Sequence, residues 1–521
     1  MDADAVVIGS GPNGLVAANL LADAGWDVLV LEAQPSYGGG VHSDRAVHPD
    51  FVHDTFSSFY PLVAISPAMR ELRLEEHGLA WSHAPAVAGS PYRDGDWAVL
   101  HRDRQRTARE LDATDPGDGE TWLRLCEMWD RLGDDLVETL MSPFPPVRQA
   151  GRTALQVPGR GGATLLRSAL GSAAGLTRRF RGDRARMLLV GNAAHGDTAM
   201  SSPGSGIYAL LLTMTAQRLG YPVPVGGASS LADALVRRLE SRGGRVVCHS
   251  PVERVLVRDG TAWGVRTSAG DTVTARRAVL ADVTAPALYG GLVPWHDLPG
   301  RTRRLMRWFR WDPGTVKVDW ALSGPVPWAV EPSAAPGTVH ISESVAEVVR
   351  YQRELEAGAV PSRPFLLAGQ MATTDPTRAP AGAESFWAYT HVPQRATSDA
   401  GGGSGRTVRG TWDHDDTERM ADRMQARVEE YAPGFGDRVV ARRVLGPREL
   451  EGRDANLRNG ALNGGTGELR QQLVLRPVPG LGMPTTPVRD LYLASMSAHP
   501  GGGVHGACGA NAAHAALRQA P

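Results

Sequence analysis

The sequence predicts an α/β fold built around a Rossmann-like dinucleotide-binding domain, and three observations carry this prediction. An apolar run from Ala5 to Ile8 has the composition of a buried parallel strand. Gly9, Gly11 and Gly14 follow it with G-x-G-x-x-G spacing, and a second apolar run ends at Glu32. The chain contains 61 glycines, so the motif alone is weak. The strand, glycine turn, helix, second strand and acid in this order make it specific.

Each residue of this motif has a physical task. Gly9 permits the tight turn, Gly11 lets the backbone approach a pyrophosphate, and Gly14 lets helix and strand pack closely. The free N–H groups at the helix start suit a diphosphate. The Glu32 carboxylate can accept both ribose hydroxyls, which predicts a dinucleotide with an unphosphorylated adenosine ribose. These residues alone leave NAD and FAD open.

A glycine cluster a few residues beyond the acid, Gly38 to Gly40, favours FAD. It suits a chain that runs back over a long cofactor and contacts it beyond the pyrophosphate. The pattern resembles the flavoprotein superfamily that includes amine oxidases and phytoene desaturases. Its usual form is Gly-Gly-Arg, so Gly40 replaces an arginine, and any contact made by that side chain is absent here.

Length, composition and charge limit the possible domain organisation, partners and location of the protein. A chain of 521 residues is too long for one core and predicts two or three interleaved domains. A formal charge of −1 argues against a nucleic-acid partner. The 3 cysteines are widely spaced and predict neither a disulfide framework nor a metal site. No apolar run reaches the roughly 18–20 residues of a membrane span. The chain starts directly on a strand with no signal peptide, so a cytoplasmic location is expected by default.

Residues 85–220 are predicted to form a largely helical insertion that helps to build the substrate site. Glu120 to Leu140 has apolar residues at helical spacing. Residues 141–186 carry nine arginines against one acid, with apolar residues between them. This segment either contacts an anionic membrane surface and admits a lipophilic substrate, or is a solvated helix face. Met187 to Val190 is interpreted as a strand-like run. His195 after it either faces the active site or is a structural histidine.

The middle of the chain alternates between helix and strand signals. A helix is expected from Gly226, with Ser229 or Ser230 near its start. Strands are expected at 245–248, 252–257, 263–266 and 272–280, and again at 315–322 and 386–390 in a substrate-domain sheet. Gly401 to Arg406 is interpreted as a flexible loop because no strand precedes it. No second dinucleotide fingerprint is present, so no NAD(P)H site beside the first is expected.

The last diagnostic stretch runs from Asp490 to His514 and combines a short strand, a Gly-rich turn and a small-residue helix. A helix start at Gly503 and Val504 would direct N–H groups at the N1/C2 carbonyl edge of a flavin. They would stabilise the negative charge that reduction places on the ring. Small residues such as Gly509 would let this helix pack tightly beneath the cofactor.

The two ends together carry a family resemblance. The sequence resembles the phytoene desaturase and carotenoid isomerase-like flavoproteins, and most of all the branch of pyridine nucleotide-disulfide oxidoreductase domain-containing proteins. The matching pieces are the opening motif through Glu32, the Gly-Gly segment, Arg476 to Pro479, and the stretch from Ala498 to Gly506. Ser495 and Ser497 depart from the usual glycines, which puts loop details in doubt but not FAD binding.

The resemblance implies a discontinuous FAD-binding domain and a set of cofactor contacts. Its parts are expected at 1–80, 221–292 and 485–521, with a helical and substrate insertion at 85–220 and a substrate domain at 293–484. Val252 is expected to contact adenine through its backbone. The expected FAD-binding residues are Gly9, Ser10, Gly11, Pro12, Asn13, Gly14, Glu32, Ala33, Gly39, Gly40, Val252, Met496, Gly502, Gly503 and Val504.

The implied chemistry is hydride transfer from a carbon of a lipophilic substrate to flavin N5, with oxygen or a quinone-like acceptor reoxidising the cofactor. His499 and His505 flank the flavin-facing turn and are the candidates for proton transfer, or they orient the loop by hydrogen bonds. Two alternatives stay open: an isomerase or cyclase without net redox change, and a non-catalytic flavin-binding protein that works through a partner. Substrate identity and oligomeric state are left open.

Overall fold

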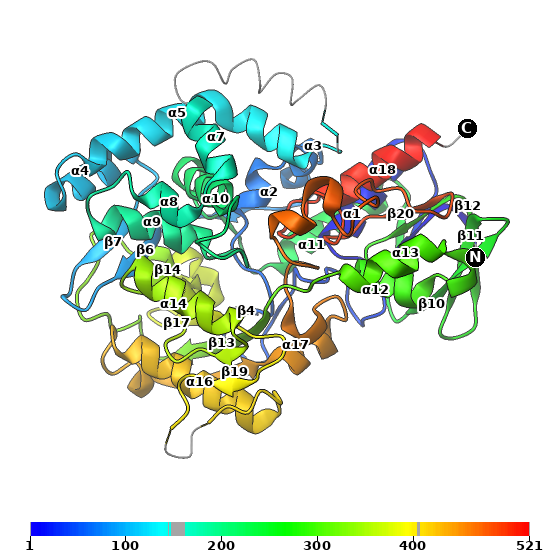
Figure 1. Cartoon of the computed structure of the whole chain (residues 1–521). Coiled ribbons are helices and arrows are strands. Elements are labelled where there is room, and N and C mark those ends of the chain that lie inside the picture. Colours follow the sequence, from blue (N-terminus) through cyan, green and yellow to red (C-terminus); the bar gives the residue numbers. More distant parts are fainter. Residues whose placement is uncertain (1, 144, 147–161, 404–406, 520–521) are drawn as a thin grey trace.

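The computed structural model describes residues 2–143, 145–146, 162–403 and 407–519. Two mixed sheets organise the chain, one at each end of the molecule, and both termini lie on the half that carries the first sheet (Figure 1). The first sheet has the order β10-β11-β12-β1-β2-β9, with β20 also paired to β12. Its strands are β1 (Asp2–Ile8), β2 (Val28–Leu31), β9 (Arg245–Val247), β10 (Val252–Arg258), β11 (Thr261–Thr267), β12 (Thr272–Ala281) and β20 (Leu491–Leu493).

Chain segments far apart in sequence meet in this first sheet. β1 pairs in parallel with β2 on one side and with β12 on the other, and β20 from the end of the chain pairs in parallel with β12. Helices α1 (Pro12–Asp23), α11 (Ser229–Ser241) and α18 (Ala507–Gln519) bury small and aliphatic side chains together with β1 and β2. The sheet confirms the predicted α/β fold.

The second sheet has the order β19-β13-β17-β16-β14-β6-β7. The predicted strands at 315–322 and 386–390 are its neighbours β13 and β17, which pair along their whole length. The helix α16 (His414–Glu429) packs its apolar residues on one face. The strands are β6 (Ala86–Pro91), β7 (Trp97–Leu100), β13 (Gly314–Leu322), β14 (Pro336–Ile341), β16 (Leu366–Gln370), β17 (Glu384–Val392) and β19 (Val439–Leu445).

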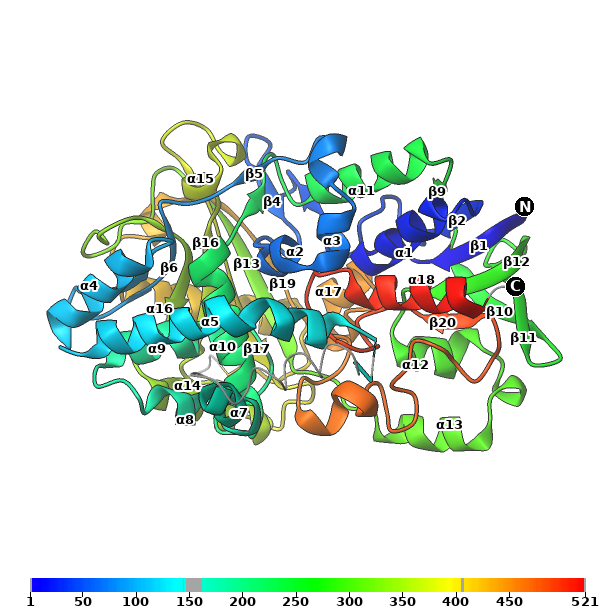
Figure 2. The ribbon, with the colours of Figure 1, turned by 90° about the horizontal axis from the view of Figure 1, so that it is seen from above.

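A layer of helices covers the second sheet, and the long helix α5 runs along it toward α18 (Figure 2). α5 agrees with the predicted helix at 120–140, and Asn511 of α18 donates to the Met141 carbonyl at its end, at 3.2 Å. The helices of this layer are α4 (Arg104–Thr114), α5 (Asp118–Met141), α7 (Gly162–Leu170), α8 (Ala173–Thr177), α9 (Asp183–Ala193), α10 (Ser205–Leu219) and α14 (Val345–Glu356).

Short elements complete the described part of the chain. They connect the two halves or close loops, and the helices among them are a few residues long. They are α2 (Pro61–Ile65), α3 (Pro67–Glu71), α12 (Ala285–Ala287), α13 (Gly300–Leu305), α15 (Met371–Thr374), α17 (Pro447–Arg453), β3 (Ser43–Asp44), β4 (His53–Asp54), β5 (Trp81–Ser82), β8 (Val223–Pro224), β15 (Ala359–Val360) and β18 (Ser398–Asp399).

Two local predictions are wrong. Met187 to Val190 is not a strand but part of α9, where all four side chains are fully buried. A short apolar run buried on every side cannot be assigned to helix or strand by periodicity. The last helix starts at Ala507 rather than at Gly503 and Val504. Gly501, Gly503 and Gly506 all have positive φ, which an α-helix excludes.

Two other predictions fall partly outside the described residues. In the loop at 401–406, residues 404–406 lie outside them, and in the basic segment at 141–186 so do residues 144 and 147–161. The described end of that segment forms α7, α8 and the start of α9. Among the helices of the described residues, none combines the length and the apolar character needed to cross a bilayer.

Candidate functional site

One cavity of about 1500 Å³ is lined by residues from both halves of the molecule. Every residue predicted to bind the cofactor lines it except Gly14, and so do both candidate proton-transfer histidines. The cofactor set in its wall is Gly9, Ser10, Gly11, Pro12, Asn13, Glu32, Ala33, Gly39, Gly40, Val252, Met496, Gly502, Gly503 and Val504. The fold therefore brings the opening motif, the glycine cluster and the C-terminal turn to one cavity.

The turn from β1 into α1 has the close packing that its glycines predict. Gly9 has φ +91°, and a Cβ on Gly14 would lie 2.4 Å from the Gly9 carbonyl oxygen. α1 begins without a side-chain cap at Gly11, and Pro12 occupies its first turn. Pro12 has no N–H, and the Gly14 N–H donates to Asp282. An anion at the cavity edge would therefore be favoured by the helix dipole and the Asn13 backbone. A diphosphate fits this turn.

Glu32 follows β2 directly and is held in a fixed position at the cavity wall. Its Oε2 accepts from the Ser10 backbone N–H at 2.9 Å and from the Ser10 hydroxyl, and its Oε1 accepts from the Gln34 N–H at 2.8 Å. A carboxylate has about four lone-pair sites. Three of these sites are occupied, so Glu32 keeps room for about one hydroxyl donor from a ligand in the cavity. Gly40, which replaces the usual arginine, has no atom within 4 Å of an added Cβ.

Asp282 is a cavity residue that sequence reasoning missed. It follows β12, whose Ala281 pairs with Ile8 of β1, so its carboxylate lies beside the glycine turn. Its Oδ2 accepts from the Gly14 N–H at 2.8 Å. Burial, with smaller contributions from the nearby carboxylates Asp454 and Glu32, raises the pKa of Asp282 to about 7, while the hydrogen bond from the Gly14 N–H opposes this change. An acid directly after an apolar strand beside β1 was the signal in the sequence that could have found it.

The C-terminal turn holds His505 by internal hydrogen bonds. His505 Nδ1 accepts from the Ala507 N–H at 3.0 Å, so Nε2 carries the proton and donates to the Gly501 carbonyl at 3.1 Å. Burial lowers the pKa of both His499 and His505 to about 4, which keeps both rings neutral near pH 7. With both nitrogens engaged, His505 is arranged to orient the turn.

The second sheet supplies an aromatic wall opposite the glycine turn. Trp387 and Tyr389 of β17 stack with ring centroids 6.0 Å apart, and both line the cavity. Lys317, the only lysine in the chain, lies on the neighbouring strand with Nζ 5.6 Å from the Trp387 ring centroid. Its Nζ donates to the Asp54 carbonyl at 2.9 Å and pairs with Asp319. Burial lowers the pKa of Lys317, and Asp319 opposes that change.

Arg476 places a buried positive charge at the cavity wall. It is 1% exposed, and among the described residues no carboxylate lies within ion-pair distance of it. Instead its guanidinium donates to backbone carbonyls, including that of Met496 at 2.7 Å and that of Asn463 at 2.6 Å. An unneutralised cation of this kind favours an anionic ligand in the cavity.

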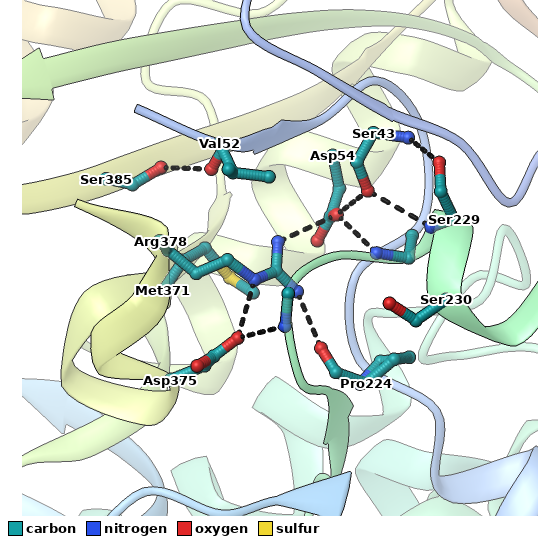
Figure 3. Close-up of polar contacts among 12 residues, drawn as sticks. Ser43, Val52, Asp54, Pro224, Ser229, Ser230, Met371, Asp375, Arg378 and Ser385 are labelled. Atoms are coloured by element: carbon teal, nitrogen blue, oxygen red, sulfur yellow. Dashed lines mark hydrogen bonds and ion pairs between the residues drawn. The ribbon is translucent and has the colours of Figure 1, made fainter. Parts of the chain in front are cut away.

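His53 and Asp54, which precede the cavity residue Tyr60, pack inside the protein and do not line the cavity. The Asp54 carboxylate accepts from Arg378 Nη1 at 2.9 Å, from the Ser43 hydroxyl and from a backbone N–H at the start of α11 (Figure 3). Arg378 is fully buried and also pairs with Asp375 at 2.9 Å. This cluster ties the second sheet to the dinucleotide-binding half.

Comparison with known proteins supports both the motif and the fold. Residues 7–72 match the family described as an NAD(P)-binding Rossmann-like domain. The chain is 28% identical to mouse pyridine nucleotide-disulfide oxidoreductase domain-containing protein 2, with 99% of this chain and 93% of the relative aligned. It is 24% identical to a neurosporene-forming phytoene desaturase of Cereibacter sphaeroides (98% and 93% aligned). It is 25% identical to prolycopene isomerase 1 of an Oncidium hybrid (96% and 81% aligned).

Solved structures show the same fold over the whole chain. An oxidoreductase from Methanosarcina mazei and a putrescine oxidase variant each superpose with a TM-score of 0.62 and cover 100% of both chains, at 14% and 16% identity. The fold and the glycine turn therefore define a chain with a Rossmann-like dinucleotide-binding domain that is similar to oxidoreductases. The resemblance to phytoene desaturase and carotenoid isomerase-like flavoproteins is confirmed over nearly the full length.

Proposed function

We propose that this oxidoreductase is a dehydrogenase or desaturase that removes hydride from a carbon of a lipophilic substrate. The single observation that carries the proposal is the continuous cavity of about 1500 Å³. Typical ligand pockets hold about 300–1,000 Å³, so this one has room for a dinucleotide and a second molecule. Its glycine-rich side suits the cofactor, and its aromatic side suits an apolar substrate.

The residues present fit FAD. The glycine turn would hold the diphosphate, Glu32 would accept a ribose hydroxyl, and Val252, which lines the same cavity, would contact the adenine. When bound, FAD supplies a hydride acceptor and hence the difficult redox chemistry. The C-terminal turn at Gly502 to Val504 and the buried charge of Arg476 provide a setting that favours negative charge on the cofactor.

The chain's own groups bind the substrate, exclude water and hold protons. Trp387 and Tyr389 offer flat apolar faces that orient a lipophilic substrate against the cofactor. Proton transfer is assigned to His499 or to solvent that reaches it, because the ring lines the cavity and is neutral near pH 7. His505 orients the turn. Reoxidation is assigned to oxygen or a quinone, since the sequence offers no second dinucleotide fingerprint.

The second candidate function is an isomerase or cyclase without net redox change. The specific observation in its favour is the similarity to a prolycopene isomerase over 96% of this chain. Activity that needs prior reduction of the flavin but consumes no acceptor would support it. A non-catalytic role is the third candidate, and retained biological activity after Gly11→Trp in a folded chain would favour it.

A lipophilic substrate raises the question of delivery, and we propose peripheral contact with an anionic membrane through residues 141–186. Leu170 in the described part of this segment is 68% exposed. Leu469, which packs against Gly204 near the start of α10, and Leu473 are also exposed and line the cavity. Arg178 and Arg181 are exposed nearby. If the Arg178→Gln/Arg181→Gln variant floats with anionic liposomes as well as wild type at low salt, membrane contact through these residues is refuted.

The experiment that tests the main proposal is an anaerobic screen of the FAD-loaded protein against lipophilic compounds. A substrate should bleach the visible flavin absorption with one equivalent of oxidised product, and oxygen or a quinone should restore it. Absence of bleaching by any member of a broad terpenoid and polyketide panel, with intact FAD binding, would count against hydride removal and leave the two alternatives.

A further inference from the structure

A pair of histidines borders the aromatic part of the cavity. His195, between α9 and α10, lines the cavity and is partly exposed to it. His340 lies on β14, is fully buried and does not line the cavity. The two Nε2 atoms are 2.8 Å apart, and the rings meet nearly edge to face at 77°. Such a distance requires one proton between the two nitrogens.

The protonation of His340 follows from what surrounds its other nitrogen. Among the described residues, Nδ1 of His340 has no hydrogen-bond partner. A Cβ on Gly191 would lie 2.4 Å from this nitrogen, so Nδ1 faces the Gly191 Cα–H, which can only act as a weak donor. An N–H at Nδ1 would be a buried donor without an acceptor. The His340 proton is therefore on Nε2, which donates to His195.

The state of His195 follows in turn. Burial lowers the pKa of both histidines, that of His340 to about 3, so both rings are neutral. A neutral His195 that accepts at Nε2 carries its proton on Nδ1. Within the described part of the chain, this Nδ1 has no hydrogen-bond acceptor in the protein, and it is not fully buried.

The phenol beside this imidazole is already engaged in a hydrogen bond of its own. The Tyr221 ring lies 5.5 Å from the His195 ring, and its hydroxyl hydrogen-bonds to Asn192 Oδ1. Asn192 is held by a bond from its amide to the Leu188 carbonyl, at 2.6 Å. His195 thus presents a fixed donor in a wall made mainly of hydrocarbon. Such a donor discriminates strongly between substrates that carry a hydrogen-bond acceptor and those that lack one.

We propose that His195 Nδ1–H, positioned by His340, binds an oxygen acceptor on the substrate, so the substrate is an oxygenated lipophile rather than a bare hydrocarbon. This inference rests on the proposed lipophilic substrate. It assigns His195 to binding and specificity, with His340 as a positioning residue. A carbonyl, ether or hydroxyl oxygen on the isoprenoid or polyketide-like molecule would meet the requirement.

The binding test uses the FAD-loaded protein and two matched isoprenoids, farnesyl methyl ether and farnesene, titrated calorimetrically. Wild type should bind the ether about tenfold more tightly, the ratio given by one net hydrogen bond. His195→Phe should reduce the ratio to about one and leave farnesene binding unchanged. His340→Phe should reduce the ratio, and the surface control His296→Phe should keep it. Equal wild-type affinities, or a ratio that survives in His195→Phe, would overturn the proposal.

A second measurement tests the histidine pair without any substrate. In ¹⁵N-histidine-labelled protein, the His195 resonances are identified by their loss in His195→Phe. They should show a neutral ring protonated at Nδ1, and the His340 resonances a ring protonated at Nε2. The opposite tautomers would overturn the inference even if isoprenoids bind. The predicted tautomers in a protein that binds neither isoprenoid would uphold the donor and refute the lipophilic substrate.

Discussion

Gly11→Ala tests the glycine turn at a residue that lines the cavity. An added Cβ would lie 2.6 Å from Asp282 Oδ2, the atom that accepts the Gly14 N–H. Overpacking of this size costs about 1–3 kcal/mol, and loss of glycine's freedom in the unfolded chain returns about 0.4–1 kcal/mol. The apoprotein should lose about 1–2 kcal/mol of stability, which lowers the Tm of a chain of this size by about 1–2 °C.

FAD affinity should fall further than stability does. The displaced Asp282 no longer fixes the N–H groups of the turn, and the methyl group keeps the backbone from the pyrophosphate, so we expect FAD to bind about 10- to 100-fold more weakly. Calorimetry on the apoprotein measures both quantities. Gly300→Ala is the matched control, because its Cβ meets only the end of an arginine side chain at 3.7 Å.

A double variant separates the packing effect from the cofactor effect. If the added Cβ clashes with the Asp282 carboxylate, Gly11→Ala should lower the free energy of unfolding very little in an Asp282→Ala background. The two substitutions are then non-additive, as expected for groups in contact. FAD binding should stay weak in the double variant. Wild-type FAD affinity in Gly11→Ala, or additive losses of stability, would refute this account of the turn.

Three further predictions concern charge and packing. Asp282→Asn should be more stable than wild type by a growing margin as the pH rises from 4 to 7, since the pKa of about 7 lets only the folded chain hold that proton. Thermal unfolding of both proteins across this pH range checks the prediction, and parallel stability profiles of wild type and variant would contradict it. FAD should also bind Asp282→Asn more tightly than wild type at pH 8. Arg378→Met leaves Asp54 and Asp375 buried without their cation and should cost about 3–5 kcal/mol in denaturant unfolding; a loss below about 1 kcal/mol would show that the cluster of Figure 3 is not needed. Gly509→Ala puts a Cβ 1.8 Å from the Asn13 carbonyl oxygen, so α18 must shift away from α1, lowering both Tm and FAD affinity relative to Gly300→Ala; unchanged values would mean that the two helices separate without cost.

The dinucleotide-binding half was predictable because its signals are local. Apolar strands, the glycine turn and Glu32 lie within about one βαβ unit, and each glycine has a steric reason that the structure shows. The errors arose where local signals conflict. The run at 187–190 is apolar on all sides because α9 is buried, and the last helix is delayed because Gly501, Gly503 and Gly506 adopt positive φ.

On the substrate side, the strands β13 and β17 and the candidate His195 were predictable, but the contacts between distant residues were not. His195 and His340 are 145 positions apart, and their contact depends on the pairing of β14 within the second sheet. Lys317 was visible as the only lysine, but not its place in the cavity wall. No spacing rule in one sequence connects such residues.

The central claim is that this cavity holds FAD at the glycine turn. The most direct measurement is an absorbance spectrum of the purified protein, followed by identification of the compound released on heating. A two-banded flavin spectrum with FAD released, and its loss in Gly11→Ala under the same purification, is the predicted result. A colourless protein that also fails to bind added FAD would contradict the account and leave the dinucleotide fold serving another ligand.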